Sequence, residues 1–178
     1  MKQEEGRRER VANLGSGRDY LAGAINVDLY AEKADIRHDL ASIPYPFDDN
    51  SFDRIHALNI IEHLDNPIDV MREIHRIGAD GCLVDIRVPH FRSASLYEDI
   101  THVRGFAWRT FDVFLGDGTV YGEYADFRFE MVSRAYTPYL FPWLYRLLSR
   151  FPVLTDNLLS KYIPMASIEF RLRVSKVR

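Results

Sequence analysis

The sequence contains only one cysteine, Cys82, and no apolar run that approaches the roughly 20 residues needed to span a bilayer. A single cysteine excludes a disulfide framework and a cysteine-based zinc site, and it makes the cytoplasm the expected compartment. The first ten residues are mostly charged, so no signal peptide is expected there. Internal repeats and low-complexity linkers are also missing. The 178 residues, 47% hydrophobic, therefore predict a single domain over residues 1–178 with a sizeable core.

Charge is divided unevenly along the chain. Residues 1–127 hold 14 Lys and Arg against 23 Asp and Glu, whereas residues 128–178 hold 9 against 3 and are also rich in aromatic side chains. This pattern fits either an anionic partner such as a membrane surface or an ordinary solvated face. The acidic first part and the lack of a nucleic-acid-binding motif argue against nucleic acid as a partner.

Short apolar runs alternate with helical patterns, which predicts βαβ units and a mostly parallel sheet. Asp85 and Arg87 interrupt an otherwise apolar fifth strand, which predicts a strand covered on both faces near its middle. The best-marked helix has Asn66 as its N-cap and Pro67 at the first helical position. Strands are expected at 11–14, 24–29, 35–39, 52–60, 82–88, 126–136 and 167–177, and helices at 67–77, 109–115, 142–151 and 156–163.

The most informative segment runs from Val11 to Asp28. It reads as an apolar strand, a Gly15-Ser16-Gly17 turn, a short connection and a second strand that ends in a carboxylate. Glycines in such a turn let the backbone approach a nucleotide-type ligand, and Asp28 is placed to accept from ribose hydroxyls. A dinucleotide-binding fold needs a third glycine where this chain has Tyr20, so NAD and flavin are disfavoured. Because many ordinary turns also use glycine, the ligand depends on the residues that follow.

Three downstream segments complete the pattern. His38-Asp39-Leu40 follows the third strand, Asn59-Ile60-Ile61-Glu62-His63-Leu64 follows the fourth, and residues 71–77 lie on a helix closed by Gly78. In this order and spacing, residues 10–90 resemble class I S-adenosylmethionine-dependent methyltransferases, particularly the type 11 group. The resemblance implies a Rossmann-like, doubly wound α/β sheet, mostly parallel, with a C-terminal antiparallel hairpin. It makes residues 10–90 the cofactor-binding half and residues 90–178 the substrate-side half.

The resemblance also implies S-adenosylmethionine as the cofactor and a role for each matching residue. Asp28 would bind the ribose hydroxyls, and Asp39 would accept from the adenine amino group. Asp19 stands where the family usually has a third glycine, which leaves open a non-catalytic cofactor-binding module of the same fold. The implied cofactor-binding residues are Gly15, Gly17, Asp28, Asp39, Leu40, Asn59, Ile60 and His63.

Methyl transfer needs a positioned acceptor and, for a hydroxyl, a base. Asp99 and His102 are three residues apart, which is the spacing that lets a carboxylate orient an imidazole on one helical turn. We therefore predict His102 as the general base and Asp99 as its orienting residue, without a metal. The alternatives are a polar lid held by its own hydrogen bonds and a metal site formed by His90, Asp99 and His102.

The aromatic segment Pro142–Phe151 has two interpretations. As part of the core, its apolar stripe packs on the sheet. As an interfacial element, it places aromatic side chains in a membrane surface with Arg146 and Arg150 toward lipid phosphates. The second interpretation would suit a glycan acceptor carried on a lipid. The sequence thus predicts S-adenosylmethionine-dependent methyl transfer to a small-molecule or glycan acceptor, at oxygen, and leaves the oligomeric state open.

Overall fold

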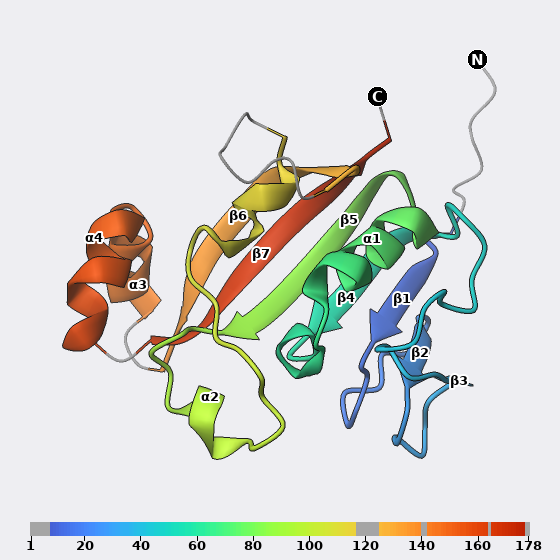
Figure 1. Cartoon of the computed structure of the whole chain (residues 1–178), viewed down its shortest axis with the longest axis horizontal. Coiled ribbons are helices and arrows are strands. Elements are labelled where there is room, and N and C mark those ends of the chain that lie inside the picture. The colour runs from blue at the N-terminus through green and yellow to red at the C-terminus, as the bar shows by residue number, and fades with distance from the viewer. Residues whose placement is uncertain (1–7, 117–124, 140–141, 164, 177–178) are drawn as a thin grey trace.

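The computed structural model describes residues 8–116, 125–139, 142–163 and 165–176. Its seven strands form one sheet in the order β3-β2-β1-β4-β5-β7-β6 (Figure 1). Strands β1 to β5 pair in parallel, and β7 pairs antiparallel with both β5 and β6. This arrangement confirms the predicted fold class and its C-terminal hairpin. The strands are β1 (Val11–Leu14), β2 (Ile25–Asp28), β3 (Ile36–Arg37), β4 (Phe52–Leu58), β5 (Gly78–Pro89), β6 (Arg128–Pro138) and β7 (Met165–Ser175).

Helix α1 (Pro67–Ile77) lies on one side of the sheet, between β4 and β5 in the chain (Figure 1). As predicted, the Asn66 side chain accepts from the backbone N–H of Asp69, and Pro67 occupies the first helical position. Gly78 follows in extended geometry because β5 begins there, so the helix ends without a left-handed turn. The apolar side chains that α1 buries are Val70, Met71, Ile74 and Ile77.

The remaining helical elements are short. The helix predicted at 109–115 is a 3-10 helix, η2 (Thr110–Phe114). The two predicted near the C-terminus are divided differently, because Pro152 starts a new helix at its first position. The elements are η1 (Ile61–His63), α2 (Ser95–Glu98), α3 (Pro142–Leu148), α4 (Pro152–Asn157) and η4 (Leu159–Lys161).

The two faces of the central strands differ in character. Val84, Ile86 and Val88 of β5 are buried, whereas Asp85 and Arg87 alternate with them and lie on the opposite face. There Asp85 pairs with arginines of β4 and β7, and Arg87 pairs with a glutamate of β7. A hollow of about 390 Å³ lies among these charged side chains. The prediction that the fifth strand is covered on both faces is therefore wrong, because the side chains of Arg87, Glu169 and Arg171 on this face are 39–47% exposed.

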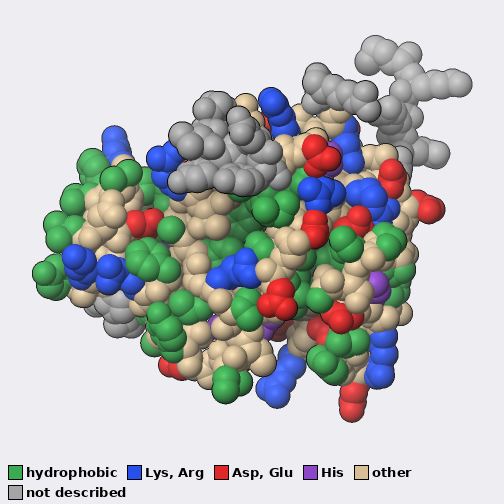
Figure 2. All heavy atoms as spheres, viewed as in Figure 1, with side chains coloured by type: hydrophobic (Ala, Val, Ile, Leu, Met, Phe, Trp, Pro, Cys, Tyr) green, Lys and Arg blue, Asp and Glu red, His purple; other side chains and the backbone are tan. Residues whose placement is uncertain are grey.

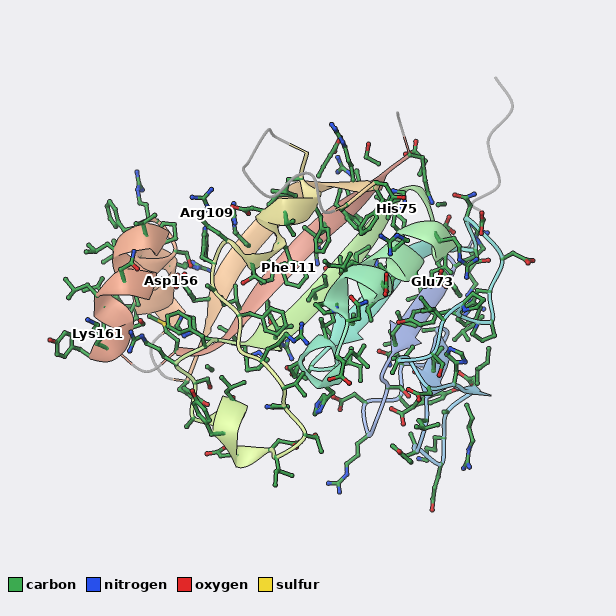
Figure 3. The ribbon with its side chains drawn as sticks, in the orientation of Figure 1. Glu73, His75, Arg109, Phe111, Asp156 and Lys161 are labelled. Carbon is green, nitrogen blue, oxygen red and sulfur yellow. The ribbon has the colours of Figure 1, made fainter. Side chains whose placement is uncertain are left out.

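Asp156 joins α4 to the sheet and to the segment after β5 (Figure 3). Its carboxylate accepts from the Tyr136 hydroxyl (2.6 Å) and the Trp108 backbone N–H (2.9 Å), and it lies 3.1 Å from Nε2 of His90. Burial alone would raise the pKa of Asp156, but the hydrogen bonds from His90, Tyr136 and Trp108 outweigh burial and hold the pKa below its ordinary value. His90, which is completely buried, therefore has a structural partner.

We expect Asp156→Asn to lower the free energy of unfolding by about 1–3 kcal/mol at neutral pH, because an amide cannot accept all three hydrogen bonds. The contribution of the carboxylate is fully present above its unfolded pKa of about 3.9 and is lost as the pH falls through the lower folded pKa. Urea unfolding of both proteins at about pH 7 and about pH 3 should show a smaller difference at the acid pH. A difference that is equal at both pH values would contradict this account.

Candidate cofactor pocket and active site

A pocket of about 490 Å³ opens where β1, β2, β3 and β4 end. Its volume falls within the roughly 300–1,000 Å³ of small-molecule sites, and this edge is where open parallel sheets bind ligands. Among the predicted cofactor residues, Gly17 and Asn59 are not part of the lining. The lining residues are Gly15, Asp28, Leu29, Tyr30, His38, Asp39, Leu40, Ala41, Ile60, His63, Leu64 and Thr101. Six of the eight predicted residues therefore line one cavity.

Asp28 organises the glycine turn as well as lining the pocket. One of its carboxylate oxygens accepts from the Gly17 N–H, and the other accepts from the N–H groups of Tyr30 and Ala31, each at 2.8 Å. Burial alone would raise the pKa of Asp28, but these three donors outweigh burial and hold the pKa below its ordinary value. The carboxylate is thus kept ionised and oriented at the end of β2, as an acceptor for ligand hydroxyls.

Both the backbone conformation and the lack of space for a side chain require glycine at position 15. Its φ of +68° favours glycine, and a Cβ built there would lie 2.5 Å from Cγ1 of Ile60. Gly17 also has a positive φ, +48°, but its nearest atom would be 4.0 Å away. The turn therefore brings the chain against Ile60 at Gly15 and leaves room at Gly17.

A buried amide pair beneath the turn was not predicted. The Nδ2 of Asn13 donates to Oδ1 of Asn26 and to the carbonyl of Asp19, both at 2.9 Å. Asn26, completely buried, also accepts from the Leu21 N–H at 2.8 Å. These contacts hold the loop of residues 15–24. The loop contains Asp19, at the position where the family that the sequence resembles usually has a third glycine. The signal in the sequence was an asparagine within each of two apolar strands.

Glu62, His63 and His102 come together beside the pocket. The Glu62 carboxylate is 1% exposed, and its Oε1 lies 4.0 Å from Nε2 of His102. The His63 and His102 rings are in edge contact, with centroids 4.6 Å apart. Burial, with a smaller contribution from the charge of Asp99, raises the pKa of Glu62 to about 7. Burial also lowers the pKa of His63, and the neighbouring His102 lowers it further.

The predicted side-chain pair of Asp99 and His102 is not formed. The Asp99 carboxylate accepts from the backbone N–H and the hydroxyl of Thr101, and Thr101 Oγ1 lies 2.8 Å from Nδ1 of His63. Helix α2 ends at Glu98, so Asp99 is extended and the three-residue spacing does not fall on a helical turn. Asp99 therefore reaches His63 through Thr101, whereas His102 faces Glu62.

The alternative metal site of His90, Asp99 and His102 is likewise not assembled. His90 contacts Asp156 on α4, and Asp99 contacts Thr101. Glu62 takes the place that the sequence interpretation gave to Asp99. It belonged to a segment that the family resemblance included, but a single acidic residue after a strand gave no sign that it would be buried against two imidazoles.

Part of the chain matches a known protein family. The family model described as "Methyltransferase domain", of the type 11 group, matches residues 17–84. Over residues 17–84 the chain is therefore similar to the type 11 methyltransferase domain. This result and the fold imply S-adenosylmethionine as the cofactor of the methyltransferase domain. The pocket fits that group, since it combines a backbone-held carboxylate, a glycine turn and a second carboxylate, Asp39, at neighbouring strand ends.

Solved methyltransferase structures share the fold at low sequence identity. A SAM-dependent methyltransferase from Archaeoglobus fulgidus is 14% identical, with 93% of this chain and 86% of that chain covered and a TM-score of 0.61. The YcgJ protein from Bacillus subtilis is 13% identical, with 96% and 93% covered and a TM-score of 0.62. A putative sarcosine dimethylglycine methyltransferase from Galdieria sulphuraria is 12% identical, with 95% and 79% covered and a TM-score of 0.59. No curated protein matches the sequence.

Proposed function

We propose that this chain transfers a methyl group from S-adenosylmethionine to an oxygen of a small-molecule or glycan acceptor. The proposal rests on one observation: a pocket with carboxylates at two strand ends also borders the cluster of Glu62, His63 and His102. The cofactor, when bound, supplies both the methyl group and its own leaving group. The tasks left to the chain are to position the acceptor and to accept a proton.

Within this proposal, His102 lies at the place where an acceptor hydroxyl loses its proton. The buried Glu62 carboxylate lies 4.0 Å from Nε2 of this imidazole. Asp99 acts indirectly. It accepts a hydrogen bond from Thr101, and Thr101 in turn contacts His63 and orients it in the wall of the pocket. Both residues of the sequence prediction thus keep a role, but Asp99 no longer acts on His102 directly.

Calorimetric titration with S-adenosylhomocysteine and with NAD tests the proposed cofactor. Saturable binding of S-adenosylhomocysteine alone supports the proposal, and binding of NAD or of neither ligand overturns it. Transfer of an isotopically labelled methyl group to polar sugar acceptors or to lipid-linked glycans then separates an enzyme from a module that only binds the cofactor. Labelled methyl recovered as an O-methyl ether or a methyl ester supports oxygen transfer, and labelled methyl recovered on nitrogen or carbon contradicts it.

An apolar and cationic surface lies at the C-terminal helices, which we call the α3–α4 surface. No described helix is long and apolar enough to cross a membrane. Leu148 is buried, as the core interpretation requires, but the surface exposes large apolar side chains beside Arg146, Arg150 and Lys161, at the left in Figure 2. The exposed apolar residues are Trp143, Leu147, Phe151, Val153, Leu154, Leu158 and Tyr162.

The α3–α4 surface lies at the same edge of the sheet as the pocket. Strand β6 leads into α3, and it runs parallel to β5 because both are antiparallel to β7. Apolar side chains mixed with cations match an anionic lipid surface. We therefore include peripheral contact with an anionic membrane in the proposal, which would present a lipid-carried acceptor near the pocket. The cytoplasmic location expected from the sequence stays a prediction.

The paired change Leu147→Ser and Phe151→Ser is expected to reduce binding to anionic vesicles by at least about tenfold, because each buried apolar side chain contributes roughly 1.5–3 kcal/mol. Flotation with vesicles that contain phosphatidylglycerol measures the bound fraction. Val132→Ser, at an exposed apolar residue on β6 outside this surface, is the matched control and should bind like the wild type. A wild-type fraction equal to that of a lipid-free sample would remove the membrane contact from the proposal.

A further inference from the structure

We infer that Glu62, His63 and His102 form a binding site for one divalent transition-metal cation such as Zn²⁺. Each of the three residues offers one ligand atom, and these atoms all lie within 4.8 Å of one another. Zinc bonds of about 2.0–2.2 Å to nitrogen and oxygen require these separations to shorten when the cation binds. The inference departs from the sequence expectation of no metal.

The Glu62 carboxylate is the strongest reason to place a cation here. Its side chain is 1% exposed, and its Oε2 has no hydrogen-bond partner among the described residues. Among these described residues, Glu62 forms an ion pair with the His102 imidazole, at 4.0 Å. Nδ1 of the His102 ring also has no hydrogen-bond partner among them. Burying a carboxylate is costly unless it is paired or coordinates a metal. A cation between Glu62 and the imidazoles would satisfy it.

The hydrogen bonds around His63 prepare it as a ligand. The hydroxyl of Thr101 donates to the Asp99 carboxylate at 2.6 Å, so Thr101 Oγ1 accepts from Nδ1–H of His63 at 2.8 Å. The proton is then on Nδ1, and Nε2 carries the free lone pair. A carboxylate that reaches a histidine in this way fixes the tautomer and raises the basicity of the ligand. Asp99 and Thr101 are thus positioning residues for His63.

The set of donors selects the kind of cation. Two imidazole nitrogens and one carboxylate oxygen suit Zn²⁺ and related transition metals, whereas Mg²⁺ and Ca²⁺ prefer oxygen ligands throughout. Three protein ligands leave at least one coordination position open. His63 and Thr101 both line the cofactor pocket, so a cation bound to His63 would lie beside that pocket. Where the proposed function holds, the cation would lower the pKa of the acceptor hydroxyl, and His102 would serve as its ligand instead of accepting the proton itself.

The test is a calorimetric titration of chelator-treated full-length protein with Zn²⁺, repeated by absorption spectroscopy with Co²⁺. One site per chain is expected. Glu62→Gln and His102→Ala should each weaken binding by more than 100-fold, and Thr101→Val should weaken it by about 10–100-fold through loss of the His63 hydrogen bond. His56→Ala is the matched control, because His56 also lies beside a carboxylate, Asp85 at 3.5 Å, but no third ligand joins them among the described residues. It should bind like the wild type.

Wild-type protein without stoichiometric binding, or ligand variants that bind Zn²⁺ as the wild type does, would overturn the inference. Glu62→Gln is nearly isosteric, and unchanged binding of S-adenosylhomocysteine by this variant shows that a loss of zinc affinity is not a loss of fold. The same titration separates the two proposals. Protein that binds S-adenosylhomocysteine but not zinc lacks the cation site and keeps the proposed function. Protein that binds zinc but not S-adenosylhomocysteine keeps the cation site and lacks the proposed cofactor.

Discussion

Gly15→Ala is expected to lower the affinity for S-adenosylhomocysteine by about 100-fold. The φ of +68° costs an alanine about 1–2 kcal/mol, and the added Cβ would lie 2.5 Å from Cγ1 of Ile60, which adds an overpacking cost of about 1–3 kcal/mol. To relieve this clash, either the turn at Gly15 or the Ile60 side chain must move. Gly15 and Ile60 both line the pocket, so either movement changes its shape. Calorimetric titration of the variant measures the loss directly.

Gly17→Ala is the matched control for this effect. Its φ of +48° imposes a similar backbone cost, but its nearest atom would be 4.0 Å from the new Cβ. We expect the Gly17→Ala variant to lose affinity by no more than about tenfold. The double change Gly15→Ala with Ile60→Ala should regain part of the loss, because it removes the atoms that clash. Equal affinities of the two single variants would show that the close approach to Ile60 does not shape the pocket.

His102→Ala is expected to reduce the rate of methyl transfer by about 10²–10⁴-fold while changing the affinity for S-adenosylhomocysteine by less than about threefold. This loss of rate is expected whether the imidazole accepts the proton of the acceptor hydroxyl itself or binds a cation that promotes release of that proton. His102 is not among the residues that line the cofactor pocket, so the cofactor does not depend on its side chain. Single-turnover measurement of labelled methyl transfer, with the cofactor saturating, gives the rate.

Asp99→Asn provides the comparison for His102. Asp99 acts through Thr101 on His63, so its loss should reduce the rate far less than the loss of His102. A direct Asp99–His102 pair would instead give similar losses for the two variants, because the two residues would act as a unit. An unchanged rate in His102→Ala would remove His102 from the reaction.

Local signals in the sequence predicted much of the fold. Asn66 and Pro67 mark the start of α1 because a side-chain cap and a fixed φ act within one turn of the helix. The carboxylates Asp28 and Asp39 were found for a similar reason, since each follows an apolar strand and parallel strands end at one edge of the sheet. These features depend on neighbours close in the chain.

Features that depend on distant residues were missed. The charges of Asp85 and Arg87 read as interruptions in a covered strand, but arginines and a glutamate from other strands satisfy them. The Asp99–His102 spacing holds only if the chain stays helical, and α2 ends before Asp99. Glu62 became significant only when the segment after α2 placed a second imidazole against it. Spacing along the chain contains none of this information.

A crystal structure of the protein with S-adenosylhomocysteine tests the central claim most directly. The account predicts the ribose hydroxyls on the Asp28 carboxylate, the adenine beside Asp39 and Leu40, and the homocysteine along the Gly15 turn. It also predicts that the sulfur lies closer to His63 and His102 than to His90, which is bound to Asp156. A ligand bound outside this pocket, or one whose sulfur points away from the cluster of Glu62, His63 and His102, would contradict the account.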